Sequence, residues 1–296
     1  MNLLDLGNNV LITGHEGFIG THLLECLPNA GIIDRKKQQL FFPETIKCLI
    51  KNVRVIFHLA GVSTGSGYSP PNEYLVRNNV LATRGLIRAI RQYCTFPPLV
   101  ILLSSIHVYK KSVCYTEATE LTPLSFYGLT KLTQELLLQT AAESQNLQSI
   151  VLRTANVYGP GCRPNYNSAV ATFCLRLKNH QPIELMGNGT SQVDLVYVKD
   201  VVKVLLRIFE LSKPPMCVYN LSSGISTPVI EVVEHLAKVA DSKPIVRLTD
   251  TPPIKFTVDN SQLLAILNGF DFTSLDVGLA ETFRHDWQTP ATQGSV

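Results

Sequence analysis

The chain has 296 residues, of which 45% are hydrophobic and 17% charged, a composition typical of a globular protein with one large domain or a core domain and a smaller lobe. Its net charge of +3 argues against a dedicated nucleic-acid-binding protein, and no apolar run approaches the roughly 20 residues that a membrane-spanning helix needs. Seven scattered cysteines without a C-x-x-C pair, and a start without a basic leader, are typical of a cytoplasmic protein with reduced thiols.

The first half of the chain alternates short apolar runs with longer segments of helical spacing. Alternation of this kind predicts an α/β fold with a Rossmann-type, doubly wound parallel sheet that helices cover on both faces. The expected strands lie at 10–12, 31–34, 53–59, 99–103 and 150–153, and the expected helices at 18–27, 44–50, 78–93 and 125–143.

The pattern loosens after residue 155, where Pro, Gly and Asn become frequent. We therefore expect residues 1–155 to form a first domain and residues 156–296 a smaller C-terminal α/β lobe. Part of 190–215 is expected to return to the first domain, especially the segment 194–209. The histidines form no cluster with the spacing of metal ligands, so we expect no metal site.

A glycine-rich turn joins the first expected strand to the first expected helix. Gly14, Gly17 and Gly20 allow a tight turn and a close approach of backbone, and the start of the helix offers N–H groups and a positive dipole to a pyrophosphate. Because the turn has both the strand before it and the helix after it, it predicts a dinucleotide cofactor, NAD or NADP.

Asp34 ends the second expected strand, twenty positions after Gly14. A carboxylate there can accept hydrogen bonds from the adenosine ribose, although an acid in a surface turn would give the same pattern. The basic run from Arg35 to Lys37 either meets the 2′-phosphate of NADP or is a solvated face of a loop. Asp34 favours NAD slightly, and NADP stays open.

Two short patterns indicate proton chemistry. Tyr127 and Lys131 are four residues apart in an expected helix, so they share one face, and an ammonium near a phenol lowers the phenol's pKa. Ser105 follows the apolar run 99–103, at the end of a strand, where open α/β sheets bind their ligands. Taken alone, the Tyr–Lys spacing is equally typical of a surface pair, and the serine is equally typical of a turn after a strand. The order and context of the two patterns together favour a catalytic site.

The ordered set of motifs resembles the extended short-chain dehydrogenases/reductases, also described as the NAD-dependent epimerase/dehydratase family of nucleotide-sugar enzymes. The resemblance covers nearly the whole chain. Its motifs are TGHEGFIG at 13–20, HLAG at 58–61, NVLATRGL at 79–86, SSIHVY at 104–109, YGLTK at 127–131, RTANVYGP at 153–160, VDLVYVKDVV at 193–202, VYNLSSG at 218–224 and GLAETF at 278–283.

The resemblance implies a role for each matched residue. Tyr127 would be the acid/base, Lys131 would bind the nicotinamide ribose and tune Tyr127, and Ser105 would polarise the reacting C–O bond. The glycine turn would hold the pyrophosphate, and the C-terminal lobe would bind the substrate. The further residues expected at the cofactor are Phe18, Ile19, Asp34, Arg35, Leu59, Ala60, Gly61, Asn79 and Ser104, and those expected at the substrate, besides Ser105, are His107 and Asn156.

Departures from the family pattern narrow the reaction. Dehydratases of the family carry Asp-Glu after the catalytic Ser or Thr, where this chain has Ile106 and His107, so dehydration is not expected. His107 matches a cysteine acid/base of the GDP-fucose synthases and can transfer protons near neutral pH, or it simply packs in the site. Those enzymes use a second histidine further on, where this chain has Ala169, so their full epimerase-reductase mechanism is not expected.

Val193 stands where many relatives bind the nucleotide diphosphate with an arginine. Either another cation, namely Arg163, Arg176 or Lys199, takes that role, or the substrate is not a standard sugar diphosphate. The connection from Asp34 to His58 is shorter than in typical 4-epimerases of the family, which favours an exchangeable cofactor.

We therefore expect an NAD(P)-dependent 4-keto-sugar reductase acting on a nucleotide-activated sugar. The alternative is a 4-epimerase with permanently bound NAD, and a remote alternative is a non-catalytic binding subunit on the same fold. A homodimer through the helices at 78–93 and 125–143 is expected, since relatives pair through equivalent helices; no nucleic-acid or membrane partner is expected.

Overall fold

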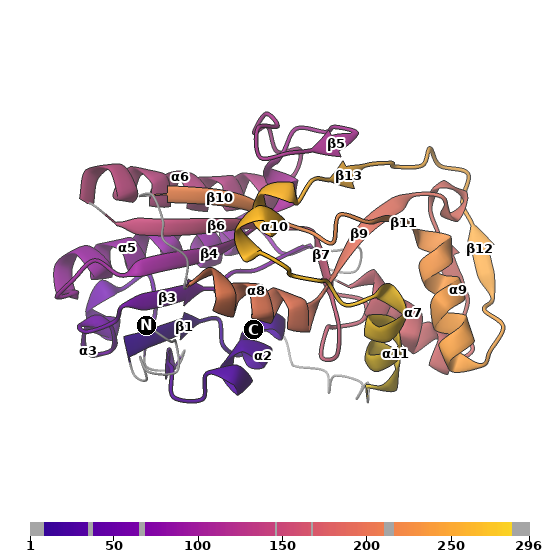
Figure 1. The fold of residues 1–296 in the computed structure, drawn as a ribbon, viewed down its shortest axis with the longest axis horizontal. Helices are drawn as coiled ribbons and strands as arrows, with labels where there is room; N and C mark the ends of the chain where they lie inside the picture. Colours follow the sequence, from indigo (N-terminus) through magenta and orange to yellow (C-terminus); the bar gives the residue numbers. More distant parts are fainter. Residues whose placement is uncertain are drawn as a thin grey trace.

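The computed structural model describes residues 9–34, 38–64, 69–145, 147–166, 168–209 and 216–285. Its centre is a six-stranded sheet in which every pair of neighbouring strands is parallel. The order is β10-β6-β4-β3-β1-β2, which confirms the predicted Rossmann-type sheet (Figure 1). The strands are β1 (Val10–Thr13), β2 (Gly31–Ile32), β3 (Val55–His58), β4 (Leu99–Ser105), β6 (Gln148–Thr154) and β10 (Met216–Leu221).

The chain reverses its direction of progress across the sheet at β1. From β1 it passes to β2 on one side, and then returns to β3 on the other side. Ligands of open parallel sheets bind outside the carboxyl ends of the strands at such a reversal. The glycine turn after β1 and the segment after β3 therefore flank the expected cofactor site.

Helices cover both faces of the sheet, as predicted (Figure 1). One face packs against α2, α8 and α10, through apolar side chains such as Leu23, Leu205 and Leu263. The other packs against α3, α5 and α6, through side chains such as Ile50 and Leu86. Their bounds are α2 Phe18–Cys26, α3 Lys47–Ile50, α5 Ala82–Tyr93, α6 Phe126–Gln145, α8 Val198–Ile208 and α10 Ser261–Leu267.

The helix expected at 78–93 begins earlier and is irregular. A turn of α-helix, α4 (Asn72–Leu75), follows Pro71, and a π-helical segment, η3 (Val76–Leu81), joins it to α5. Proline is favoured at a helix start, whereas the π segment has no signature in a spacing pattern of period 3.6. The helix expected at 44–50 likewise begins with a 3₁₀ turn, η2 (Pro43–Ile46), before α3.

A second layer of structure lies beyond the carboxyl ends of the main sheet. A mixed sheet of three strands has the order β11-β9-β7, and helices α7, α9 and α11 pack around an apolar cluster there that includes Phe173 and Leu236 (Figure 1). The remaining elements are β5 (Cys114–Tyr115), β7 (Asn156–Tyr158), α7 (Ala169–Lys178), β8 (Ile183–Leu185), β9 (Gln192–Tyr197), β11 (Ser226–Pro228), α9 (Val229–Ala240), β12 (Val246–Leu248), β13 (Thr257–Val258), α11 (Leu275–Arg284) and the 3₁₀ turns η4 (Ile106–Val108) and η5 (Gly187–Gly189).

The C-terminal half contributes directly to the main sheet. Helix α8 packs its apolar side chains on the sheet, and β10 pairs with β6 over six residues. Helix α10 joins the same apolar cluster. The division of the chain at residue 155 stays a prediction, with these returning elements as its exceptions.

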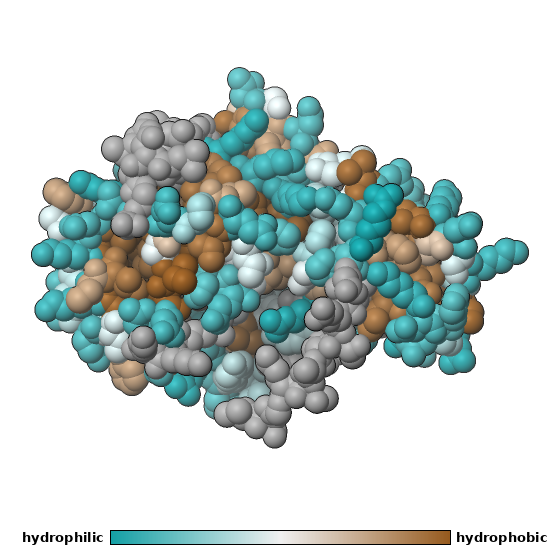
Figure 2. Space-filling view, turned by 90° about the horizontal axis from the view of Figure 1, so that it is seen from below, coloured by the Kyte–Doolittle hydropathy of each residue, from teal (hydrophilic) through white to brown (hydrophobic). Residues whose placement is uncertain are grey.

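The surface in Figure 2 is polar over much of its described area, with apolar side chains gathered toward the two ends of the molecule. At the end that carries β8 and β12, the exposed hydrophobic residues include Met186, Ile245 and Leu248. Among the residues that the structure describes, no helix has the length and apolar character needed to cross a membrane.

Candidate active site

The glycine turn after β1 leaves no room for side chains. Gly14 has a φ of +77°, and a Cβ built on it would lie 2.7 Å from the backbone nitrogen of Ala60. A Cβ on Gly20 would lie 2.1 Å from the carbonyl oxygen of Gly14. Gly17 stands at the N-cap of α2 and has no side chain to accept the helix's first N–H groups. Phe18 and Ile19, which open α2, therefore present backbone N–H groups where a pyrophosphate would be bound.

A cavity of about 300 Å³ lies beside this turn. It extends from Gly14 past Ile33, at the end of β2, to Ala60 and Gly61 after β3. Its outer wall is formed by Phe41 of the connection after β2 and by Arg77, whose guanidinium lies 4.8 Å from the centre of the Phe41 ring. The position and size of the cavity fit the adenosine half of a dinucleotide.

The short connection after β2 is packed directly on α5. A Cβ on Gly85 would lie 2.0 Å from the carbonyl oxygen of Leu40. Asp34 is exposed at the start of this connection, and its backbone N–H donates to the Gln38 side chain at 3.0 Å. Arg35 lies outside the described residues, so its expected contact with the cofactor stays a prediction. The sequence missed Phe41 and Arg77, because neither belongs to a recognised pattern. Gly85 lies in the motif at 79–86, but the motif did not indicate its close contact with Leu40.

Asn79 clamps the segment after β3. Its side-chain oxygen accepts from the N–H of Val62 at 2.7 Å, and its side-chain nitrogen donates to the Val62 carbonyl at 3.0 Å and to the Thr130 hydroxyl at 2.9 Å. Asn79 is fully buried. It therefore connects the segment after β3, which contains Leu59 to Gly61, with α6 next to Lys131. Its side-chain amide is fully used by these protein partners.

Ser105, Tyr127 and Lys131 meet where β4 ends beside the start of α6. The hydroxyls of Ser105 and Tyr127 share a hydrogen bond. The Lys131 ammonium donates to the carbonyl oxygen of Leu103 at 2.7 Å. The two motifs, twenty-two residues apart in sequence, are therefore brought together as the sequence predicts.

The acid–base properties of this group are set mainly by burial. Burial raises the pKa of Tyr127 to about 12, and the hydrogen bond to Ser105 opposes that rise only in part. Burial also lowers the pKa of Lys131 to about 8, against the opposing charge of Glu135. The Lys131 ammonium donates to the Leu103 carbonyl in this structure, and the expectation that it tunes Tyr127 stays a prediction.

His107 lies at the edge of the same group. Its ring stands edge-on to the Tyr127 ring, with centroids 6.0 Å apart, and its backbone N–H donates to the Ser105 hydroxyl at 3.2 Å. Part of His107 reaches the surface, yet the packing around its ring lowers its pKa. A neutral imidazole at pH 7 therefore faces the Tyr127 ring.

A buried polar chain that the sequence did not reveal lies behind the site. His58, at the end of β3, joins the Thr13 hydroxyl to the Thr83 hydroxyl, with both distances 2.8 Å. Thr13 also accepts from the N–H of Ala60 at 3.1 Å, and Gln134 donates to Thr83 at 2.7 Å. Burial, and secondarily the charge of Lys131, lowers the pKa of His58 to about 3, so its imidazole is neutral. The sequence feature that could have indicated this buried polar chain is a histidine in an otherwise apolar strand.

Ser104 points away from the site. It is 4% exposed, and its hydroxyl donates to Glu135 in the interior. Glu135 also binds Arg153 of β6, whose Nη2 lies 2.8 Å from the carboxylate. The side chain of Ser104 is thus held by Glu135, and its expected contact with the cofactor stays a prediction.

Of the expected substrate residues, Ser105 and His107 lie at the end of β4 and in η4, and Asn156 lies in the second layer. Asn156 is exposed at the start of β7, opposite Leu195 of β9. Val193, also in β9, packs against the apolar cluster of that layer. Asp194 beside it accepts from the N–H of Ser223 at 2.8 Å, and burial raises the pKa of Asp194 to about 6.

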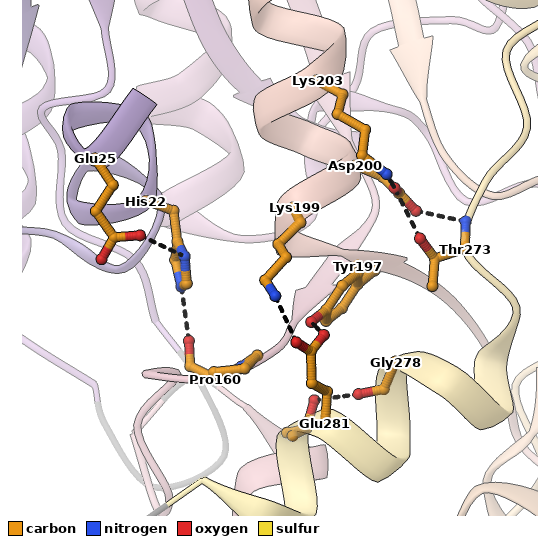
Figure 3. A network of polar contacts seen from close by, with 11 residues as sticks. His22, Glu25, Pro160, Tyr197, Lys199, Asp200, Lys203, Thr273, Gly278 and Glu281 are labelled. Atoms are coloured by element: carbon orange, nitrogen blue, oxygen red, sulfur yellow. Dashed lines mark hydrogen bonds and ion pairs between the residues drawn. The ribbon is translucent and has the colours of Figure 1, made fainter. Parts of the chain in front are cut away.

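The cations that were considered as replacements for an arginine at position 193 have protein partners. Arg176 donates to the carbonyl of Pro182 at 2.6 Å, and Arg163 lies 5.8 Å from the centre of the Tyr166 ring. Figure 3 shows Lys199 and Tyr197 converging on Glu281 of α11. The structure thus brings none of these three cations to Val193 by a direct interaction.

The phosphate turn and the second layer are in contact through α2. His22, one turn into α2, has its Nε2 2.8 Å from the carbonyl oxygen of Pro160, just after β7 (Figure 3). Its ring also packs edge-on against Phe18. Within the described part of the chain, no group of three or more His, Cys, Asp or Glu residues is arranged to hold a metal ion.

A parallel sheet with a glycine turn, an adenosine-sized cavity and a Ser–Tyr–Lys group at the end of β4 defines an extended short-chain dehydrogenase/reductase. A profile of the NAD-dependent epimerase/dehydratase family matches residues 10–222, and the chain belongs to that family.

Curated relatives and a solved structure agree with this assignment. The chain is 34% identical over 239 residues to UDP-2-acetamido-2,6-beta-L-arabino-hexul-4-ose reductase of Pseudomonas aeruginosa, a match that covers 79% of this chain and 58% of the relative, less than two thirds of its length. It is 28% identical over 312 residues to the uncharacterized UDP-glucose epimerase YtcB of Bacillus subtilis, covering 91% and 95%. MoeE5 in complex with UDP-glucuronic acid and NAD is 29% identical, with a TM-score of 0.80 and coverage of 93% and 97%.

Proposed function

We propose that the protein is a 4-keto-sugar reductase that uses NAD(P)H on a nucleotide-activated sugar. The observation that carries this proposal is the hydrogen-bonded pair of Ser105 and Tyr127 where β4 ends beside the start of α6. A hydroxyl pair of this kind can hold a carbonyl oxygen and protonate it. The relative from Pseudomonas aeruginosa is itself named as a reductase of a hexul-4-ose.

Each residue of the Ser105, Tyr127 and Lys131 group would have its own role in the reaction. When bound, the reduced cofactor would supply the hydride for the carbonyl carbon. Ser105 donates a hydrogen bond to the carbonyl oxygen, which polarises the C–O bond, and Tyr127 delivers its hydroxyl proton to that oxygen. With the pKa of Tyr127 at about 12, the phenol is protonated and ready to act as an acid. Lys131, with a pKa near 8, would stabilise the resulting phenolate.

The short connection that covers the adenosine cavity favours a reductase over an epimerase. Among the described residues of the connection after β2, Gln38 to Phe41 line this cavity, and Leu40 packs on α5 at Gly85. A short cover favours a cofactor that exchanges after each turnover. A reductase needs this exchange, whereas an epimerase uses its cofactor in both half-reactions without releasing it.

The second candidate is a nucleotide-sugar 4-epimerase with NAD held through the cycle. YtcB, which matches 91% of this chain, is named as a UDP-glucose epimerase, and MoeE5 holds both NAD and a UDP-sugar. Asp34 at the end of β2 favours NAD slightly over NADP in either case.

The expected homodimer and the role of the second layer remain proposals. The exposed faces of the helices around α5 and α6 carry Leu81, Leu129 and Leu136, which suit a contact with a second copy. The second layer, with Asn156 and His107 at its border, would hold the nucleotide sugar.

The deciding experiment is to measure the cofactor that remains in freshly purified protein. Denaturation followed by mass spectrometry should find a largely empty site, and NADH or NADPH should then bind reversibly and reduce a member of a panel of 4-keto nucleotide sugars. Stoichiometric NAD together with interconversion of UDP-sugar epimers would instead establish the epimerase.

A further inference from the structure

The last three residues of β4 meet one face of α6 in three consecutive contacts. The three helix residues are four positions apart, so they lie above one another on the same face. Two of the contacts belong to the proposed catalytic group, and the third lies deeper in the protein. The pairs are Ser105 with Tyr127, the Leu103 carbonyl with Lys131, and Ser104 with Glu135.

Glu135 is the buried end of this series. The residue is 3% exposed, and both of its carboxylate oxygens are occupied. One oxygen accepts from the Ser104 hydroxyl, and the other accepts from Arg153 at 2.8 Å and 3.1 Å. A carboxylate with so many charge-assisted hydrogen bonds is held in one position.

Lys131 is a second buried cation near the same carboxylate. It is 6% exposed and lies one helical turn before Glu135, whose charge favours its protonated form. Its ammonium donates a hydrogen bond to the Leu103 carbonyl, which carries no net charge. Glu135 therefore binds one buried cation, Arg153 on β6, and lies one helical turn from a second, Lys131.

The other ionisable groups that face this cluster come from β3, from the segment after η4 and from the loop before α6. His58 of β3 is neutral, because its pKa is about 3. Tyr109 accepts from Arg153 at 3.2 Å and, with a pKa of about 12, is neutral as well. Glu117 accepts from the N–H of Asn220 at 2.8 Å, on the far side of Tyr109. Glu135 is thus the acid that binds Arg153 and whose charge acts on Lys131.

We propose that Glu135 is a positioning residue of the reaction, which keeps the Lys131 ammonium protonated and holds the end of β4 against α6. The role of Lys131 in turnover rests on the proposed function, whereas the electrostatic link between the two residues does not. Burial alone would discharge Lys131 near neutral pH, since a buried ammonium loses its proton readily. The carboxylate of Glu135 opposes this loss.

A direct test follows the protonation of Lys131 in the protein without substrate. Protein labelled with [13Cε]lysine is titrated by NMR, and Lys131→Met assigns the signal. In Glu135→Gln the midpoint should fall by at least about one pH unit, equivalent to a tenfold change in proton affinity. In Arg153→Met the midpoint should rise, because this variant lacks a cation that repels Lys131. The Glu135 carboxylate then interacts with Lys131 alone. Unchanged midpoints in both folded variants would overturn the electrostatic link.

Ser104→Ala gives a variant that keeps every charge and is expected to fold. Its Lys131 midpoint should match the parent protein, while its kcat should fall about threefold to tenfold with an unchanged KM for the cofactor, in line with the loss of one buried hydrogen bond. An unchanged kcat would overturn the role of Glu135 in holding β4. If Glu135→Gln is too unstable to titrate, the rise in Arg153→Met and this variant still decide the proposal. The NMR readout needs no substrate, so failure of the reductase assay leaves it intact.

Discussion

The carbonyl oxygen of His107 lies 2.2 Å from the position that a Cβ would take at Gly128. Gly128 follows the catalytic tyrosine, and the missing side chain lets the first turn of α6 pack directly on η4. The approach brings the Tyr127 ring to the His107 ring and sets the distance from Tyr127 to Ser105.

Gly128→Ala should therefore push α6 away from η4. We expect kcat to fall at least about tenfold and the stability to fall by about 1–3 kcal/mol, the range for overpacking of a tight contact. Steady-state kinetics and urea unfolding measure the two effects. Leu129→Ala, on the exposed side of the same turn, is the control. Equal activity in the two variants would show that the close packing at Gly128 does not matter.

Tyr127→Phe should remove the proton donor and leave the fold intact. We expect turnover to fall by about two to four orders of magnitude, the usual contribution of general acid catalysis. Binding of NADH or NADPH, followed by fluorescence, should change little, because the cavity and the glycine turn are distant from the lost hydroxyl. Retained turnover would contradict the mechanism.

Gly14→Ala should block the cofactor. The new Cβ would collide with Ala60, and the residue has a φ of +77°. Gly269→Ala is a matched control, because Gly269 has a similar φ of +73° but no heavy atom within 4 Å of the added Cβ. Both variants should lose about 1 kcal/mol from backbone strain. Only Gly14→Ala should weaken dinucleotide binding, measured by calorimetry; comparable affinities would place the cofactor elsewhere.

His58 should make the fold sensitive to acid. The unfolded chain protonates this residue near pH 6.5, while the folded chain does so only near pH 3, so its contribution to stability is lost as the pH falls below 6.5. Between pH 7 and pH 5 the loss is about 2 kcal/mol for this single group. His58→Gln should lack this part of the decline when both proteins are unfolded in urea at the two pH values. Parallel declines would mean that His58 is already charged in the folded protein.

The sequence predicted the order of strands and helices well in the first half of the chain, because strands such as β1, β3 and β4 contain short apolar runs. The pairing of Ser105 with Tyr127 was also accessible, since strand ends and helix faces follow from simple periodicities. The return of β10 to the sheet could not be predicted, because nothing in the sequence of this segment indicates which strand it pairs with. The direction of the Lys131 side chain was not accessible either. Spacing on a helix shows which residues share a face, but it does not show that the Lys131 ammonium donates to the Leu103 carbonyl.

The buried polar residues were the least accessible part of the site. Glu135, Arg153 and His58 look like ordinary surface or motif residues in the sequence, and only their packing shows that they are enclosed. Arg77 and Phe41 stack across a cavity although 35 positions of chain separate them, which no local pattern can indicate.

The pairing of β10 with β6 has a consequence for how the protein is made. A nascent chain that has emerged only as far as β6 exposes the whole edge of that strand, including Ile150 and Leu152, which are buried in the finished molecule. Exposed edges of this kind invite wrong pairing between chains. The main sheet can therefore be completed only after synthesis has passed residue 221. Truncated chains that end in the second layer are expected to aggregate.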